Sequence, residues 1–328
     1  MRFLTDYWDL AIYLNAYQAL RLGEDPYSNE LLIRELGPYM YAPITLFLWA
    51  FHPLVYVVLS PLCVLGLLYV WWKHWDCRWW ELLIITCLGL GMAMTIALKG
   101  GQAVVYEQLL LWIGLTFYLK KSYNWASLFI CLSAMFKLWP IVFLLVMYER
   151  KQTLWWALAF VVSIFVQAWW YPSWLLGVAS TVSWQSVYKG EWVYSLYMRL
   201  TKHAWLFVII MGVVWALTAK IFNRCAPTYR VRLLMASLVC SLPVVQPYTL
   251  IALIPLAAWT TREINRRAVA LTLFCVGIYP MTGHPLSINV QLNILYHWPL
   301  MMVWAIWGTT VYTLFQRRMA CSLTSCSS

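Results

Sequence analysis

Charged residues are scarce in this chain of 328 residues: they make up 11% of it, whereas apolar residues make up 63%. A soluble domain has about 25% charged and 45–50% apolar residues, so a water-soluble fold cannot absorb this excess. In lipid, a backbone without water must satisfy its own hydrogen bonds as helices or as a closed barrel. The apolar runs are long and continuous rather than alternating, so we predict an all-α bundle of transmembrane helices.

Several sequence motifs are also missing. There is no Cys-x-x-Cys pair, no Asn-x-Ser/Thr glycosylation acceptor and no glycine-rich nucleotide loop. The nine cysteines lie in apolar runs, in predicted cytoplasmic turns or in the C-terminal tail, which excludes a disulfide framework. His284 and His297 lie far apart in the chain with no nearby carboxylate, so we expect no metal and no cofactor.

The formal net charge of +11 does not indicate a nucleic-acid partner, because the basic residues are spread over short turns between apolar runs. In a membrane protein such turns hold the topology. The 23 Trp and 21 Tyr residues point the same way, since these rings favour the two membrane interfaces. We therefore expect the lipid bilayer, and no nucleic acid, as a partner.

The apolar runs predict about eleven helical segments, several of them half-length. A perpendicular span needs about 20 residues. Two long runs are interrupted by polar residues and proline, which break a helix at membrane depth and are tolerated where they line a protein cavity. We predict one domain over 1–318 and a disordered cytoplasmic tail over 319–328. The runs are 53–72, 81–98, 103–119, 124–148 (broken at 137–140), 153–170, 204–222, 233–261 (broken at 243–247), 268–280 and 298–316.

The distribution of basic residues orients the chain. If the Lys- and Arg-rich turns face the cytoplasm, 15 of the 23 basic residues lie inside and most acidic residues lie outside. The opposite orientation would violate the positive-inside rule. The long polar stretches 1–40, 171–203 and 281–297 then lie on the outer face, where we expect the working surface. Residue 1 also falls outside, so we expect a further helix upstream or an unusual route of translocation.

The stretch 6–27 carries the most informative pattern. Apolar and aromatic residues recur at helical spacing from Leu10 to Leu20, which predicts an amphipathic helix at the outer interface. Asp6 and Asp9 are three residues apart and share one face of this helix. On pattern alone, acidic residues in a first turn are also typical of helix capping, so both a capping and a chemical role stay open.

Five segments of the chain form an ordered set of motifs. They are DLAIYLNAYQALRLGEDPY (9–27), YMYAPITLFLWAFHPL (39–54), GGQAVVYEQLLLWIGL (100–115), FKLWPIVFLLVMYERKQTLWW (136–156) and VVQPYTLIALIPLAAW (244–259). In order and rough spacing they resemble glycosyltransferase family 87, the polyprenyl-phosphate-mannose-dependent enzymes of the GT-C superfamily. The chain departs from the family pattern at Leu10, where an aromatic residue is usual, and at Ala42, where a second proline is expected. The family's first transmembrane helix is absent before residue 1.

The resemblance implies a membrane hexosyltransferase, with mannose as the first candidate sugar. Sugar would pass from a polyprenyl-phosphate donor to a hydroxyl of a lipid or glycan acceptor, with inversion at the anomeric carbon. Asp9, by its match to the motif, would be the general base that takes the proton of the acceptor hydroxyl. Asp6 would orient Asp9 or help to bind the acceptor. The resemblance also favours a bacterial cytoplasmic membrane, with the active site on its outer face.

Cationic and polar residues on the predicted outer side are candidates for binding the donor phosphate or the sugar. Lys137, at a helix break, is the first candidate to stabilise the leaving phosphate, although a lysine near a helix end can also reach the interface by snorkelling. The loop with Lys99 and Gln102 can equally be an ordinary interfacial loop. The other candidates are Lys189 and Arg199 in the late outer loop, and Tyr13 and Tyr27 of the opening motif.

Two alternative functions stay open from the sequence. A transporter or flippase of lipid-linked sugars would share the broken helices and the buried lysine, but it would not need a carboxylate at the outer face. A catalytically inactive member of the GT-C superfamily would be consistent with the absent first helix.

Overall fold

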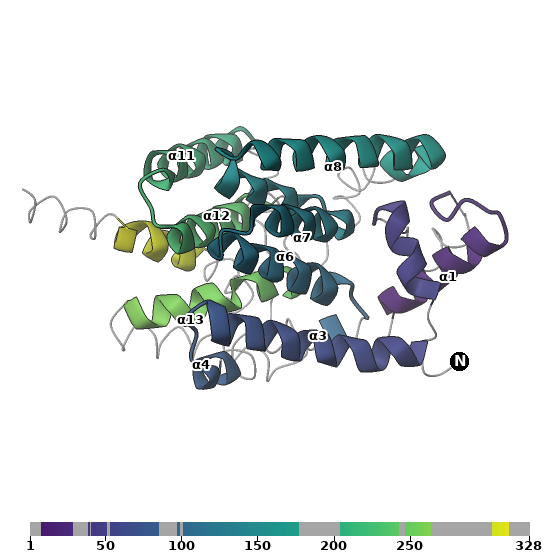
Figure 1. The fold of residues 1–328 in the computed structure, drawn as a ribbon, viewed down its shortest axis with the longest axis horizontal. Helices are drawn as coiled ribbons and strands as arrows, with labels where there is room; N and C mark the ends of the chain where they lie inside the picture. Colours follow the sequence, from purple (N-terminus) through teal and green to yellow (C-terminus); the bar gives the residue numbers. More distant parts are fainter. Residues whose placement is uncertain are drawn as a thin grey trace, which may run out of the picture. The chain divides into compact units, whose positions relative to one another are not determined.

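The computed structural model describes residues 8–28, 39, 41–50, 53–84, 97–98, 101–176, 204–242, 247–263 and 304–314. Within these ranges every regular element is an α-helix or a 3-10 helix (Figure 1). The expected all-α class is thereby confirmed, whereas the number of about eleven segments stays a prediction. The chain divides into two compact units, Met1–Val70 with Thr95–Lys189 and Trp71–Met94 with Gly190–Ser328. A single domain over 1–318 also stays a prediction.

The first unit is built around three consecutive helices. Figure 1 shows α6, α7 and α8 beside one another, and α7 packs against both of its neighbours. Helix α1 packs on η2 at one side of this group. The elements are α1 (Trp8–Arg21), η2 (Pro43–Ala50), the first part of α3 (Pro53–His74), α6 (Val104–Leu119), α7 (Tyr123–Phe136), η4 (Trp139–Met147) and α8 (Lys151–Trp170).

Helices α6 and α7 form a tight hairpin. Helix α6 ends in a Schellman motif, in which the N–H of Ser122 donates to Phe117 O at 2.9 Å and Lys121 takes the left-handed conformation with φ 59°. Gly114 then allows the two backbones to approach, because a Cβ there would lie 3.0 Å from Ala126 O. This hairpin fixes the register between the first turn of α6 and the last turn of α7.

The predicted break in the run 124–148 is confirmed. Helix α7 ends at Phe136, and η4 begins at Trp139. Pro140 explains the break, since its ring would clash with the carbonyl of Phe136 if the helix continued. Lys137 therefore has extended backbone at the junction of two helical elements, with φ −142° and ψ 137°.

The second unit holds its polar groups in small internal networks. Arg232 is buried, lies 4.5 Å from the ring centroid of Trp259 and donates to Trp75 O. Helix α12 ends at Ser241 and η7 begins at Pro247, which confirms the predicted interruption of the run 233–261. The elements are α4 (Trp79–Ile84), α11 (Ala204–Phe222), α12 (Pro227–Ser241), η7 (Pro247–Leu253), α13 (Ile254–Glu263) and a helical segment over 304–314.

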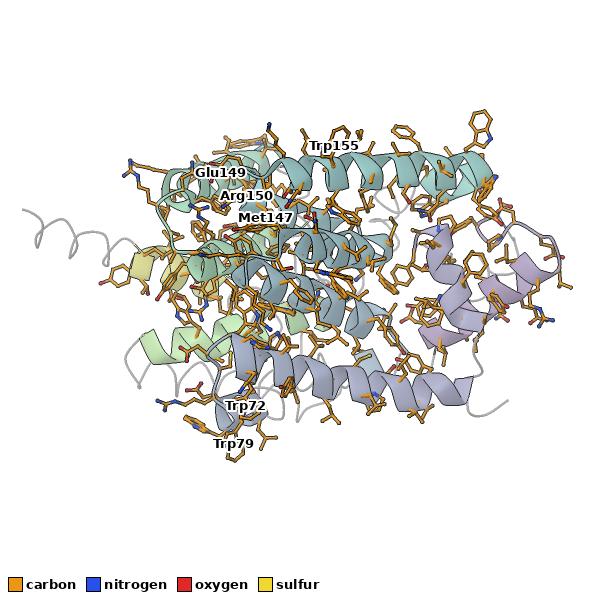
Figure 2. All side chains as sticks on the ribbon, viewed as in Figure 1. Trp72, Trp79, Met147, Glu149, Arg150 and Trp155 are labelled. Carbon is orange, nitrogen blue, oxygen red and sulfur yellow. The ribbon has the colours of Figure 1, made fainter. Side chains whose placement is uncertain are left out.

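Three helices in the described part of the chain are long and apolar enough to cross a membrane: Tyr56–His74, Lys151–Trp170 and Trp205–Phe222. Their outward surfaces carry large apolar side chains. On α8, for example, Trp155 is 70% exposed and Trp169 is 85% exposed, and Figure 2 shows Trp155 projecting from the outer side of this helix. Side chains of this size on an outward face suit lipid better than water, as expected for a membrane protein.

Candidate functional site

Asp9 lies in the first turn of α1, the helix predicted from the spacing of apolar residues. The buried face of this helix includes Leu10 and Tyr13, as the spacing predicts, and continues through Ala16 and Ala19, whereas Tyr17 and Leu20 are half-buried. The small side chains let α1 lie close to its neighbours. Asp9 itself is partly buried, and its Oδ2 atom is shielded from solvent.

The Gly-Gln segment contacts the start of α1 directly. Gly101 has φ +71°, and a Cβ at this position would lie 2.6 Å from the Cβ of Leu10 and 3.1 Å from its backbone nitrogen. Only glycine fits this combination of a left-handed backbone and a close approach. The family resemblance gave only the order of the segments 9–27 and 100–115 along the chain. In the structure the two segments are in contact next to Asp9.

An aromatic cluster supports the same face of α1. We use this name for Tyr13, Tyr39, Tyr41 and Trp49, of which the Tyr13 ring stacks on Trp49 with centroids 4.4 Å apart. The other ring pairs within the cluster meet at tilted or edge-on angles, the geometry that aromatic rings prefer. The cluster extends to α7 through Phe136, the residue before Lys137, whose ring centroid lies 6.2 Å from that of Tyr41.

Hydrogen bonds of the tyrosine hydroxyls link the members of the aromatic cluster to one another. The hydroxyls of Tyr13 and Tyr41 lie 2.9 Å apart, the hydroxyl of Tyr27 donates to Tyr41 O at 2.9 Å, and the indole of Trp49 donates to the hydroxyl of Tyr39. Burial raises the pKa of the Tyr27 phenol far above its usual range, so this group stays protonated and donates. These hydrogen bonds and ring contacts link α1 to η2 and to the segment 39–41.

Lys137 lies within electrostatic reach of two carboxylates, those of Glu107 and Asp9. Asp9 also influences Tyr41. The pKa of the Tyr41 phenol is raised mainly by burial and secondly by the negative charge of Asp9. Asp9 of α1, Glu107 at the start of α6 and Lys137 at the end of α7 thus influence one another electrostatically. A carboxylate beside a cation can accept a proton from one group while the cation stabilises negative charge on another.

Glu107 is a site residue that sequence reasoning missed. It is fully buried in the first turn of α6, where the sequence was interpreted only as an acidic residue near the outer side. Its Oε1 accepts from the side-chain amide of Gln108 at 3.3 Å. The signal was available, since Glu107 is the one acidic residue in the apolar run 103–119.

The remaining predicted site residues divide into two groups. Gln102 is buried beside Gly101, and Tyr13 and Tyr27 are buried with their hydroxyls bonded to the protein, so the structure brings these three near Asp9. Their contact with substrate stays a prediction. Asp6, Lys99, Lys189 and Arg199 lie outside the described residues, as do His284 and His297.

Asp25, which closes the opening motif, has a local structural role. Its Oδ1 accepts the N–H of Tyr27 at 2.9 Å, which forms a tight turn, and its Oδ2 accepts the hydroxyl of Ser173. The turn therefore anchors the segment after α1 to the helical turn that follows α8. In the part of the chain that the structure describes, no group of three His, Cys, Asp or Glu side chains is arranged to hold a metal ion.

Comparison with known proteins gives two relatives, and no protein-family model matches the chain. A stretch of 88 residues is 39% identical to an alpha-(1->6)-mannopyranosyltransferase of Mycobacterium tuberculosis, and covers 26% of this chain and 15% of that protein. Part of this chain is similar to mannosyltransferases. A probable alpha-(1->6)-mannopyranosyltransferase of Mycolicibacterium smegmatis is 38% identical over 88 residues, 16% of its length. The matched stretch spans about a seventh of each relative, and membership of family 87 stays a prediction.

Proposed function

We propose that this protein is a membrane glycosyltransferase that moves a hexose, with mannose as the first candidate, from a polyprenyl-phosphate donor to a hydroxyl of a lipid or glycan. The observation that carries the proposal is the close contact of Gly101 with Leu10 beside Asp9, and it is supported by the electrostatic influence of Asp9 on Lys137. The mannosyltransferase names of the two partial relatives support the same class of reaction.

The reaction is a single displacement. The carboxylate of Asp9 accepts the proton of the acceptor hydroxyl while its oxygen forms a bond to the anomeric carbon. The bond from that carbon to the phosphate oxygen breaks, and the polyprenyl phosphate leaves with the electron pair. Attack from the face opposite the phosphate inverts the anomeric carbon. The ammonium of Lys137 stabilises the charge that develops on the leaving phosphate.

A lipid-linked donor fits a protein of this composition. The outward faces of the long helices suit lipid, so a polyprenyl chain can reach the protein from within the bilayer. We place the active site on the outer face of a bacterial cytoplasmic membrane, following the distribution of basic residues. Asp6, Lys99, Lys189 and Arg199 are proposed as further substrate contacts on that face.

The test is sugar transfer in membranes that contain the chain, supplied with radiolabelled polyprenyl-phosphate mannose. Asp9→Asn keeps the shape of the side chain but removes the base, so we expect transfer to fall by about 10²–10⁴-fold. The matched control is Asp76→Asn, which makes the same chemical change at an exposed loop residue. Equal transfer by wild type and Asp9→Asn would assign Asp9 to helix capping and overturn the proposed mechanism.

A further inference from the structure

Glu107 is a buried acidic residue that the proposed reaction does not use. None of its surface is exposed, and its Oε2 atom has no hydrogen-bond partner among the described residues. Burying an ionised carboxylate is costly unless a cation compensates for the lost water. The side-chain amide of Gln108 donates to Oε1, but a neutral donor leaves the charge itself to be balanced by a nearby cation.

Lys137 supplies this charge through a fixed arrangement of helices. The hydroxyl of Ser133 donates to the backbone carbonyl of Glu107 at 2.8 Å, which ties the first turn of α6 to the last turn of α7. Lys137 is the first residue after α7, so its backbone is held on the same side as Glu107. Both Glu107 and Asp9 lie within electrostatic reach of Lys137.

We propose that Glu107 is a positioning residue that holds the ammonium of Lys137 in place beside Asp9, so that Asp9 stays available as the base and Lys137 stays available to the phosphate. This inference rests on the proposed function. Without the charge of Glu107, Lys137 would be drawn towards Asp9. The resulting ion pair would neutralise the carboxylate that must accept a proton and would draw the ammonium away from the leaving phosphate.

The first measurement is steady-state kinetics of Glu107→Gln, which removes the charge and keeps the volume. We expect kcat to fall by about 10–100-fold while the KM for the acceptor stays within about threefold, since a misplaced catalytic group slows the reaction step. Glu107→Asp keeps the charge and should recover part of the loss. The matched control, Glu149→Gln, changes an exposed glutamate of the same unit and should match wild type.

A double-mutant cycle separates positioning from a merely structural role. If Glu107 acts through Lys137, Glu107→Gln should cause no further loss in a protein that already carries Lys137→Gln. Two losses that multiply would overturn the proposal. Glu107→Gln alone leaves a buried charge uncompensated and could prevent folding. The double variant removes both charges, so it can still be compared with Lys137→Gln.

Binding of polyprenyl phosphate without sugar distinguishes the failure of this inference from the failure of the proposed function. Its affinity can be measured by tryptophan fluorescence of the purified protein in detergent. A wild-type protein that binds this lipid but transfers no sugar would refute the proposed function. The double-mutant cycle of Glu107 and Lys137 could then still be measured, with the Kd for polyprenyl phosphate in place of the rate of transfer. A non-additive loss of affinity would then support the pairing of Glu107 with Lys137. Additive losses, or no binding by wild type, would overturn it.

Discussion

At the scale of single residues, the candidate site depends on one close backbone contact. Gly101 and Leu10 come from segments separated by about ninety positions in the sequence, and they meet beside Asp9 with no room for a side chain on the glycine. The sequence marks Gly101 only as part of a weak motif. Its importance follows from the positive φ and from the distance to Leu10, and neither quantity can be derived from residue types.

We therefore predict that Gly101→Ala lowers both stability and transfer. A left-handed backbone costs a residue with a Cβ about 1–2 kcal/mol, and overpacking against Leu10 adds about 1–3 kcal/mol. Because the shift displaces the start of α1, transfer should fall by more than the fraction of protein that unfolds. Thermal unfolding in detergent and the transfer assay measure the two effects.

Gly23→Ala is the matched control for this prediction. Gly23 also has a positive φ, at +77°, but an added Cβ would have no atom within 4 Å. This variant should therefore show the cost of the backbone conformation without the clash. If Gly101→Ala and Gly23→Ala behave alike, the contact with Leu10 contributes nothing to the site.

At the scale of helices, the breaks at proline were predictable and the side-chain partners were not. Pro140 explains the end of α7, since its ring would clash with the carbonyl of Phe136, whereas Pro61 is accommodated inside α3. The buried face of α1 was only partly predicted, since the alanines that pack there carry little hydrophobic signal of their own. Glu107 could have been noticed as a lone acidic residue in an apolar run, but its proximity to Lys137 depends on the α6–α7 hairpin.

The outward face of α8 leads to a prediction about the membrane. Val162 lies near the middle of this helix and is 52% exposed. If α8 spans the bilayer, Val162→Arg should reduce insertion by about 2.5–3.5 kcal/mol, because a charge in mid-bilayer is costly. On a surface that faces water, the same change would cost at most about 0.5 kcal/mol. The inserted fraction of the chain in membranes, measured by alkaline extraction, checks the prediction.

Leu154→Arg provides the comparison for this measurement. Leu154 is also exposed, but it lies one turn from the start of α8, where an arginine can extend its charged end to the interface. We expect this variant to insert almost as well as wild type. Equal insertion by both arginine variants would contradict a membrane-spanning α8.

At the scale of the whole molecule, the orientation in the membrane decides where the site can act. The basic turns predict that the loop after α6 faces the cytoplasm and that the segment after α1 faces outward. Within the first unit, the exposed residues Lys120 and Ser28 report these two sides. A donor and an acceptor on the outer face can be used only if the side of Ser28 is the outer one.

We predict that a cysteine replacing Ser28 reacts with a membrane-impermeant maleimide added to intact cells, whereas one replacing Lys120 reacts only after the membrane is permeabilised. Four of the five described native cysteines are buried, and the unsubstituted protein supplies the background signal. The reverse labelling would place Asp9 on the cytoplasmic side, where the proposed outer-face reaction cannot occur. Labelling of both positions in intact cells would mean that the basic turns do not set the topology, and the outer-face location would then lose its support.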